Sequence, residues 1–174
     1  MKRGAFVFIF LAVLVVALPA SAQVSATGTL AVSGTLAESI QISITSGSLT
    51  LGGTSQAATV PAGTIQKFGG TLTGGFTQTA STATDYTIGG NFNVKVDYAN
   101  GASANYTLTG ELNSAALSGT TWTLGAVTLN NTTAQNLTTS GTYGSAANYA
   151  LAIKITNAAT GSIANTVNLV ATSN

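Results

Sequence analysis

Apolar residues alternate with polar ones along several stretches of this chain, and this period of two constrains the fold more than any other feature. In the clearest run, Phe92, Val94, Val96 and Tyr98 are separated by single polar residues. Successive side chains of a strand point to opposite faces, so such runs are typical of strands that bury one face. Only Phe68, Leu72 and Phe76 recur at helix-like intervals of four, and the glycine pairs between them disfavour a helix there. The pattern predicts an all-β protein.

Two hairpins are predicted from the longest alternating runs. Residues 149–155 and 167–171 alternate on either side of the polar stretch 157–162, so we expect them to pair, with Lys154 facing outward. In the middle of the chain, the run ending at Tyr98 is followed by Asn100-Gly101 and a second run from Tyr106. The apolar residues of the two runs lie on the same face of a hairpin only if the loop between them has an odd number of residues. We therefore predict the loop Asn100-Gly101-Ala102 with Gly101 left-handed.

Shorter alternating pieces extend this pattern towards both ends. Residues 24–51 suggest two or three strands, with a bulge or a close backbone approach at Gly34. Residues 67–87 suggest short strands or an ordered loop. Trp122 and Leu124 open another strand. Six to nine short strands with frequent turns favour an immunoglobulin-like (pilin-like) antiparallel β-sandwich with Greek-key connections. We expect a single β-sandwich domain over residues 23–174.

The first residues have the order of a cleaved secretory signal peptide. Lys2 and Arg3 precede an apolar run of 14 residues, 5–18, and Ala20-Ser-Ala22 follows it. The apolar run is shorter than the ~20 residues that a membrane-spanning helix needs. We therefore expect residues 1–22 to be removed, which leaves a secreted protein at the cell surface or outside the cell, after transit through the periplasm, with no membrane span.

The expected mature chain is nearly neutral. Three lysines and four carboxylates remain, so the net charge is 3 − 4 = −1. Such a chain has no basic surface for nucleic acid or for anionic lipid. Charged residues make up 5% of the whole sequence, against about 25% in a typical domain. A nearly uncharged surface resists association poorly, which suits a subunit or coat component.

The side chains that most enzymes use are missing after residue 22. The mature chain has no His, Cys or Arg, which excludes histidine acid–base chemistry, thiol nucleophiles and His/Cys metal sites. We predict no catalytic, cofactor or metal site and no enzymatic activity. The remaining catalytic alternatives are a carboxylate pair such as Asp97 and Glu111, and a Ser-Lys dyad that uses Lys95 or Lys154. Trp122 and Tyr143 are the candidate contacts for a ligand, because aromatic rings form the platforms of carbohydrate sites.

Several motifs resemble those of a known class of secreted bacterial proteins. The C-terminal run Gly161-Ser-Ile-Ala-Asn-Thr-Val-Asn-Leu-Val-Ala-Thr resembles the closing strand of spore-coat-protein-U-like and fimbrial-subunit-like domains. Ile40-Gln-Ile-Ser-Ile-Thr with Leu49-Thr-Leu-Gly52 is similar to their early strands. Ser103-Ala-Asn-Tyr-Thr-Leu108 and Thr121-Trp-Thr-Leu-Gly125 look like a recurring secreted bacterial family. The resemblance implies a pilin-like sandwich that serves as a structural or adhesive protein.

Two functional hypotheses follow from these observations. The first is a secreted structural or adhesive surface protein, a fibre, pilus or coat subunit, which associates with itself or with other surface proteins. In this case the alternating segment 23–36 is the candidate strand for donation to a neighbour's sheet edge. The second is an extracellular carbohydrate-binding module that uses Trp122 or Tyr143.

Overall fold

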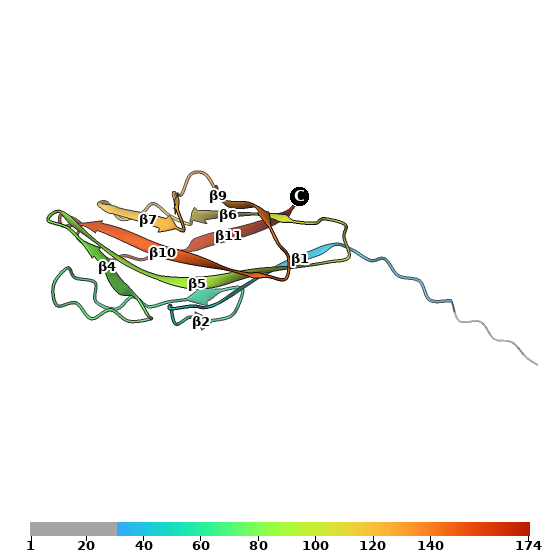
Figure 1. The fold of residues 1–174 in the computed structure, drawn as a ribbon, viewed down its shortest axis with the longest axis horizontal. Helices are drawn as coiled ribbons and strands as arrows, with labels where there is room; N and C mark the ends of the chain where they lie inside the picture. Colours follow the sequence, from blue (N-terminus) through green and yellow to red (C-terminus); the bar gives the residue numbers. More distant parts are fainter. Residues whose placement is uncertain (1–30) are drawn as a thin grey trace, which may run out of the picture. The chain divides into compact units, whose positions relative to one another are not determined.

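A computed structural model describes residues 31–174, and Thr35–Asn174 form one compact unit (Figure 1). Within that range the chain is all-β, with antiparallel pairing throughout and no helix. Accordingly, nothing in residues 31–174 forms a helix with the length and apolarity to cross a bilayer. The predicted signal peptide and residues 23–30 lie outside the described residues. Residues 31–38 form no strand.

The described residues contain eleven strands, of which three have only two residues. They are β1 Ser39–Ser46, β2 Gly52–Gly53, β3 Ala58–Thr59, β4 Thr77–Ser81, β5 Asp85–Ala99, β6 Tyr106–Leu112, β7 Thr120–Leu124, β8 Val127–Thr128, β9 Gln135–Gly141, β10 Ala146–Thr156 and β11 Val167–Ser173. The expectation for residues 67–87 is confirmed, since β4 and the start of β5 fall there.

The larger sheet is built on β5, a strand of 15 residues. One edge of β5 pairs with β10 over the whole length of β10, and β7 and β8 continue the sheet on that side. The other edge is shared, because β1 pairs with Phe92–Ala99 and β4 pairs with Tyr86–Gly89. The chain leaves the sheet after β1 and returns at β4, and the β2–β3 hairpin lies in this excursion.

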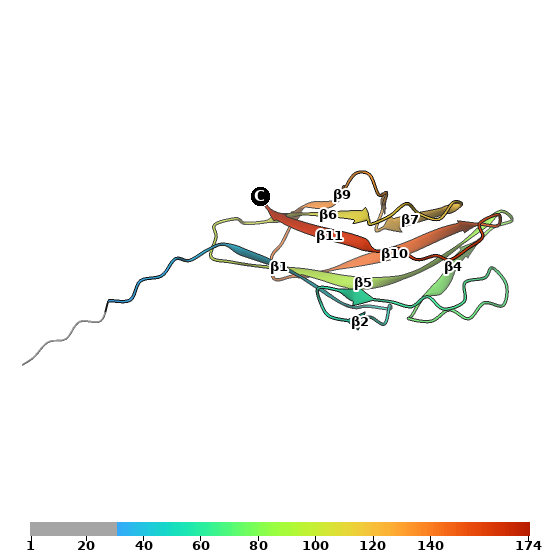
Figure 2. The same cartoon turned by 180° about the vertical axis from the view of Figure 1, so that it is seen from behind.

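The smaller sheet has three strands in the order β11–β6–β9. Figures 1 and 2 show β6, β9 and β11 in one layer and β5 and β10 in the other, an arrangement like a β-sandwich. The edge strands β1 and β11 approach each other on one side. The core lies between the layers and contains every second residue of the long strands: Tyr86, Ile88, Phe92, Val94 and Val96 of β5, Tyr106, Leu108 and Leu112 of β6, and Leu151, Ile153 and Ile155 of β10.

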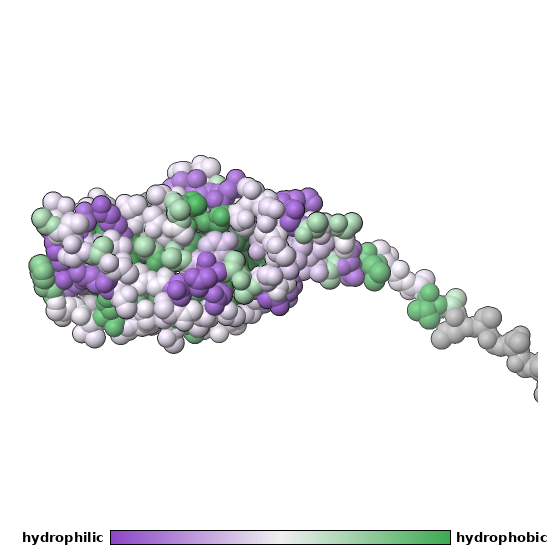
Figure 3. All heavy atoms as spheres, viewed as in Figure 1, coloured by the Kyte–Doolittle hydropathy of each residue, from purple (hydrophilic) through white to green (hydrophobic). Residues whose placement is uncertain are grey.

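The predicted inward faces of the long strands are confirmed. In β10, Leu151, Ile153 and Ile155 are buried and Lys154 is exposed, whereas Tyr149 is half-buried. Lys154 extends to Asp85, with 3.1 Å between Nζ and Oδ2. Most of the face in Figure 3 is pale, with strongly hydrophilic residues scattered over it, as expected for a surface rich in small and hydroxyl side chains.

Both predicted hairpins are wrong. β10 pairs with β5 and β7, whereas β11 pairs with β6 in the other sheet, so residues 157–166 cross between layers. Likewise β5 and β6 belong to different sheets, and the left-handed residue between them is Asn100 (φ 61°) instead of Gly101. The physical reason is the same in both places. A period of two defines which face of a strand is buried, but a sandwich buries that face equally well on either layer.

Candidate functional site

An apolar groove with a volume of about 410 Å³ opens between the two sheets. One wall is the excursion after β1, including Leu49 and residues 58–62, and the other is the segment 163–169, which includes the start of β11. Phe92 of β5, Trp122 of β7 and Leu151 and Ile153 of β10 also line it.

β11 forms one wall of the groove and has an open edge. It pairs with β6 on one side, and no strand of residues 31–174 pairs with its other side. Val167, Leu169 and Ala171 alternate with exposed residues and are half-buried, so they face the core. An unpaired edge beside an apolar groove offers backbone N–H and C=O groups to an incoming strand. Main-chain pairing and side-chain burial can therefore occur at one place.

Trp122 lies in the wall of this groove. It is 7% exposed and stands opposite Ile153 of β10 in the strand register. The indole also borders a smaller cavity of about 170 Å³ beside Ile163 and Asn165. Its Nε1 is buried and has no hydrogen-bond partner among the described residues. Buried donors are usually paired, which makes this indole an exception.

Tyr143, the second candidate ligand contact, lies in a separate cluster of aromatic residues. It follows β9, and its ring stacks on Tyr98 with centroids 4.7 Å apart and an interplanar angle of 14°. Tyr106 is tilted against it at 5.3 Å. The Tyr143 hydroxyl donates to Ser103 Oγ at 3.4 Å. Tyr143 does not line the groove, so the structure does not bring the two sequence-predicted residues, Trp122 and Tyr143, into one site.

Desolvation raises the pKa values of three tyrosines in or beside this cluster. Burial is the main cause that raises the pKa of Tyr98, and the nearby Glu38 carboxylate raises this pKa further. Burial also raises the pKa values of Tyr106 and Tyr149. These phenols therefore stay protonated at neutral pH.

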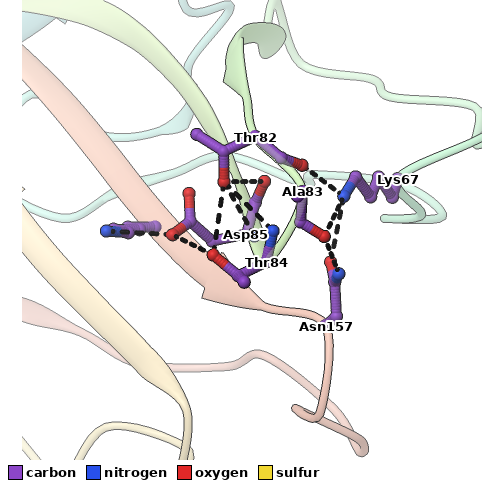
Figure 4. A network of polar contacts seen from close by, with 7 residues as sticks. Lys67, Thr82, Ala83, Thr84, Asp85 and Asn157 are labelled. Atoms are coloured by element: carbon purple, nitrogen blue, oxygen red, sulfur yellow. Dashed lines mark hydrogen bonds and ion pairs between the residues drawn. The ribbon is translucent and has the colours of Figure 1, made fainter.

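Sequence reasoning missed the role of Lys67, which joins three segments (Figure 4). Its Nζ donates to Thr82 O at 2.5 Å, to Ala83 O at 3.3 Å and to Asn157 Oδ1 at 3.3 Å. Asn157 Nδ2 in turn donates to Ala83 O at 2.7 Å. An ammonium group has three protons, and all three have acceptors here. Lys67 thus holds together the excursion, the β4–β5 turn and the β10–β11 connection beside an open hollow of about 770 Å³.

The carboxylates considered for catalysis lie apart in the fold. Asp97 is on β5 and forms an ion pair with Lys95 at 3.0 Å, whereas Glu111 is on β6 in the other sheet, opposite Asn168. Residues 31–174 contain no group of three His, Cys, Asp or Glu side chains that could hold a metal ion.

Comparison with protein-family models, curated proteins and solved structures finds no match to this chain.

Proposed function

We propose that this chain is a secreted structural or adhesive surface protein, a fibre, pilus or coat subunit without catalytic activity. In this proposal, Thr35–Asn174 form an immunoglobulin-like, pilin-like sandwich with Greek-key connections, and the signal peptide directs the chain through the periplasm to the cell surface. The observation that carries the proposal is the apolar groove beside the open edge of β11. An apolar groove with an unpaired strand edge is suited to receive a strand.

The occupant we propose for the groove is the segment 23–36 of a second copy. Its even-numbered residues are all apolar or glycine, and its odd-numbered residues are Gln, Ser, Thr or Ala. The even-numbered residues are Val24, Ala26, Gly28, Leu30, Val32, Gly34 and Leu36. Of these, Val32, Gly34 and Leu36 are described, and the two large apolar side chains, Val32 and Leu36, are 87% and 83% exposed. Large apolar side chains this exposed gain from a partner that covers them.

Length and energy are both compatible with this occupant. The segment has 36 − 23 + 1 = 14 residues and is about 46 Å long when extended. It is therefore long enough to pair with all seven residues of β11, which span about 23 Å. Each large apolar side chain that becomes buried contributes roughly 1.5–3 kcal/mol. Donation from one copy to the next is a head-to-tail contact, which continues into a filament if it does not close into a ring. The proposal therefore predicts a head-to-tail assembly, either a filament or a closed ring.

The test compares assembly of the mature chain with that of two double variants. We expect light scattering to show oligomers that grow with concentration, and we expect deletion of residues 23–36 to abolish them. Leu30→Asp with Val32→Asp should do the same, because both place a charge in the groove. Thr29→Asp with Ser33→Asp is the matched control, since these residues would face solvent, and it should assemble. A monomeric mature chain at high concentration, or equal behaviour of the two double variants, would overturn the proposal.

The alternative function, an extracellular carbohydrate-binding module, has less support from the same residues. Trp122 is buried, and one face of the Tyr143 ring is covered by Tyr98. A carbohydrate platform needs an exposed ring face. A glycan array that shows binding, together with its loss in Tyr143→Ala, would favour this alternative over the structural role.

A further inference from the structure

Tyr98 and Tyr143 form a nearly parallel stack between segments that are far apart in the sequence. Tyr98 is at the end of β5 and Tyr143 lies between β9 and β10, so 143 − 98 = 45 positions separate them. Their ring centroids are 4.7 Å apart and the planes differ by 14°. Both residues are half-buried, so the stack is held by packing and still reaches the surface. Two phenol rings are therefore held face to face at a place that a soluble oxidant can approach.

A carboxylate lies beside the hydroxyl of one ring. The Tyr98 hydroxyl and the Glu38 carboxyl both lie at Gly101, where a Cβ would overlap the Tyr98 hydroxyl and come within 2.9 Å of Glu38 Cδ. Glu38 is exposed, and its carboxylate can accept a proton. A phenol that stays protonated at neutral pH must lose its proton when it loses an electron. Glu38 is placed to take that proton from Tyr98.

We propose that Tyr98 and Tyr143 are an oxidative cross-linking site. A haem peroxidase that uses hydrogen peroxide would oxidise both rings and so join them into dityrosine. Each phenol loses one electron and one proton and becomes a phenoxyl radical. The two radicals couple through a carbon–carbon bond between ring carbons ortho to the hydroxyls. The two ortho hydrogens then move to the oxygens, which restores both aromatic rings. Overall, two tyrosines and one hydrogen peroxide give one dityrosine and two waters.

The neighbouring Tyr106 is a poorer partner for Tyr143. Its ring is tilted by 46° and is only 2% exposed. Gly141 packs directly against this ring, because a Cβ at that position would overlap its carbon atoms. A ring enclosed in this way cannot turn to present an ortho carbon. The stacked pair Tyr98 and Tyr143 is the pair that the geometry favours.

The cross-link would give the domain a covalent bond that its composition otherwise lacks. The chain has no cysteine, so no disulfide can form. Dityrosine at this site would join the end of β5 to the loop before β10 and close a loop of about 45 residues. This inference does not depend on the groove or on its occupant. It concerns a bond within one copy of the chain.

The experiment treats the mature chain with a haem peroxidase and hydrogen peroxide. We expect the monomer to lose the mass of two hydrogens, to gain dityrosine fluorescence, and to yield one cross-linked peptide pair containing residues 98 and 143. By analogy with a disulfide that closes a loop of this size, the melting temperature should rise by about 8–16 °C. Tyr98→Phe and Tyr143→Phe should abolish the product, whereas Tyr86→Phe, at a buried position outside the stack, should retain it.

Three results obtained with the unmodified sequence would each overturn the proposal, and none of them depends on whether a variant folds. Peptide mapping of the unmodified sequence that finds another tyrosine pair, only cross-links between copies, or no cross-link would overturn the proposal. Glu38→Gln should give the same product several-fold more slowly at neutral pH, because the amide cannot accept the proton. An unchanged rate in Glu38→Gln would overturn the role assigned to Glu38.

Discussion

The side chain of Leu49 lies directly over the backbone of Gly90, at the point where β1 and β4 separate along the edge of β5. A Cβ at Gly90 would overlap Leu49 Cδ2 and lie 2.8 Å from Leu49 Cγ. Leu49 is 1% exposed, and its N–H donates to Asn91 O at 2.9 Å. Ser48 and Asn91 exchange two further hydrogen bonds, of 2.6 and 2.8 Å. Residues 48 and 49 thus close the gap that the two partner strands leave.

Substitution of Gly90 should destabilise the domain through this contact. Gly90→Val introduces atoms into a space that Leu49 fills, and overpacking of this kind costs about 1–3 kcal/mol. Chemical denaturation of the mature chain measures the change in unfolding free energy. Gly34→Ala is the control, because nothing lies within 4 Å of a Cβ there. Equal stabilities of the two variants would show that Leu49 moves aside at no cost.

Trp122 should tolerate phenylalanine better than alanine. Its Nε1 has no hydrogen-bond partner within residues 31–174, so Trp122→Phe removes no hydrogen bond there, and we expect a loss of about 1–2 kcal/mol from the smaller ring. Trp122→Ala should cost about 3–5 kcal/mol, because it leaves a large cavity. Denaturation curves of both variants give the comparison. A phenylalanine variant as unstable as the alanine variant would indicate that the indole N–H is bonded in solution.

Replacing Lys67 should loosen three segments at once. Lys67→Met keeps the aliphatic stem and removes three donors, which we expect to cost about 1 kcal/mol for this partly exposed group. Hydrogen exchange should increase in residues 61–76 and in the β4–β5 turn. Lys95→Met is the matched control, because its surface ion pair with Asp97 contributes little. Faster exchange confined to residue 67 itself would contradict the bridging role.

Acid should weaken the domain through Asp85. Its hydrogen bond with Lys154 is the main cause that lowers its pKa from 3.8. A lowered folded-state pKa stabilises the fold above the unfolded value, and this contribution disappears as the pH falls through the folded pKa. Lys154→Met should therefore be less stable than the unmodified chain at pH 7, and the difference should shrink as the pH falls below 3.8 and vanish below the folded-state pKa of Asp85. A difference that persists there would mean that Lys154 acts through packing.

The buried faces of the long strands could be predicted from sequence because alternation is a local property. Phe92, Val94 and Val96 are separated by polar residues, and all three are in the core. Pairing partners could not be predicted in the same way, because a half-buried strand satisfies its pattern in either layer. The Asn100-Gly101 pair is an example. It has the composition of a hairpin turn, yet it connects the two sheets.

The groups that build the candidate sites escaped prediction for a related reason. Two of the three acceptors of Lys67 are backbone carbonyls, which every residue has, so no side-chain pattern marks them. The groove combines β7, β10 and β11 with an excursion from β1, and only the tertiary fold brings them together. Trp122 and Tyr143 could be selected as aromatic residues. Their separation into two sites depends on strand pairing that the alternation does not encode.

The pairing of distant strands also bears on how fast the domain can form. β1 meets β5 with Ser39 opposite Ala99, which is 60 positions away, and β11 meets β6 with Val167 opposite Leu112, which is 55 positions away. Domains dominated by such non-local pairs fold in milliseconds to seconds, because long loops must close before any pair contributes. A wall of the groove is β11, which is held by such distant pairs with β6. The receiving surface is therefore complete only after the long loop between β6 and β11 has closed, and assembly through the groove requires this step.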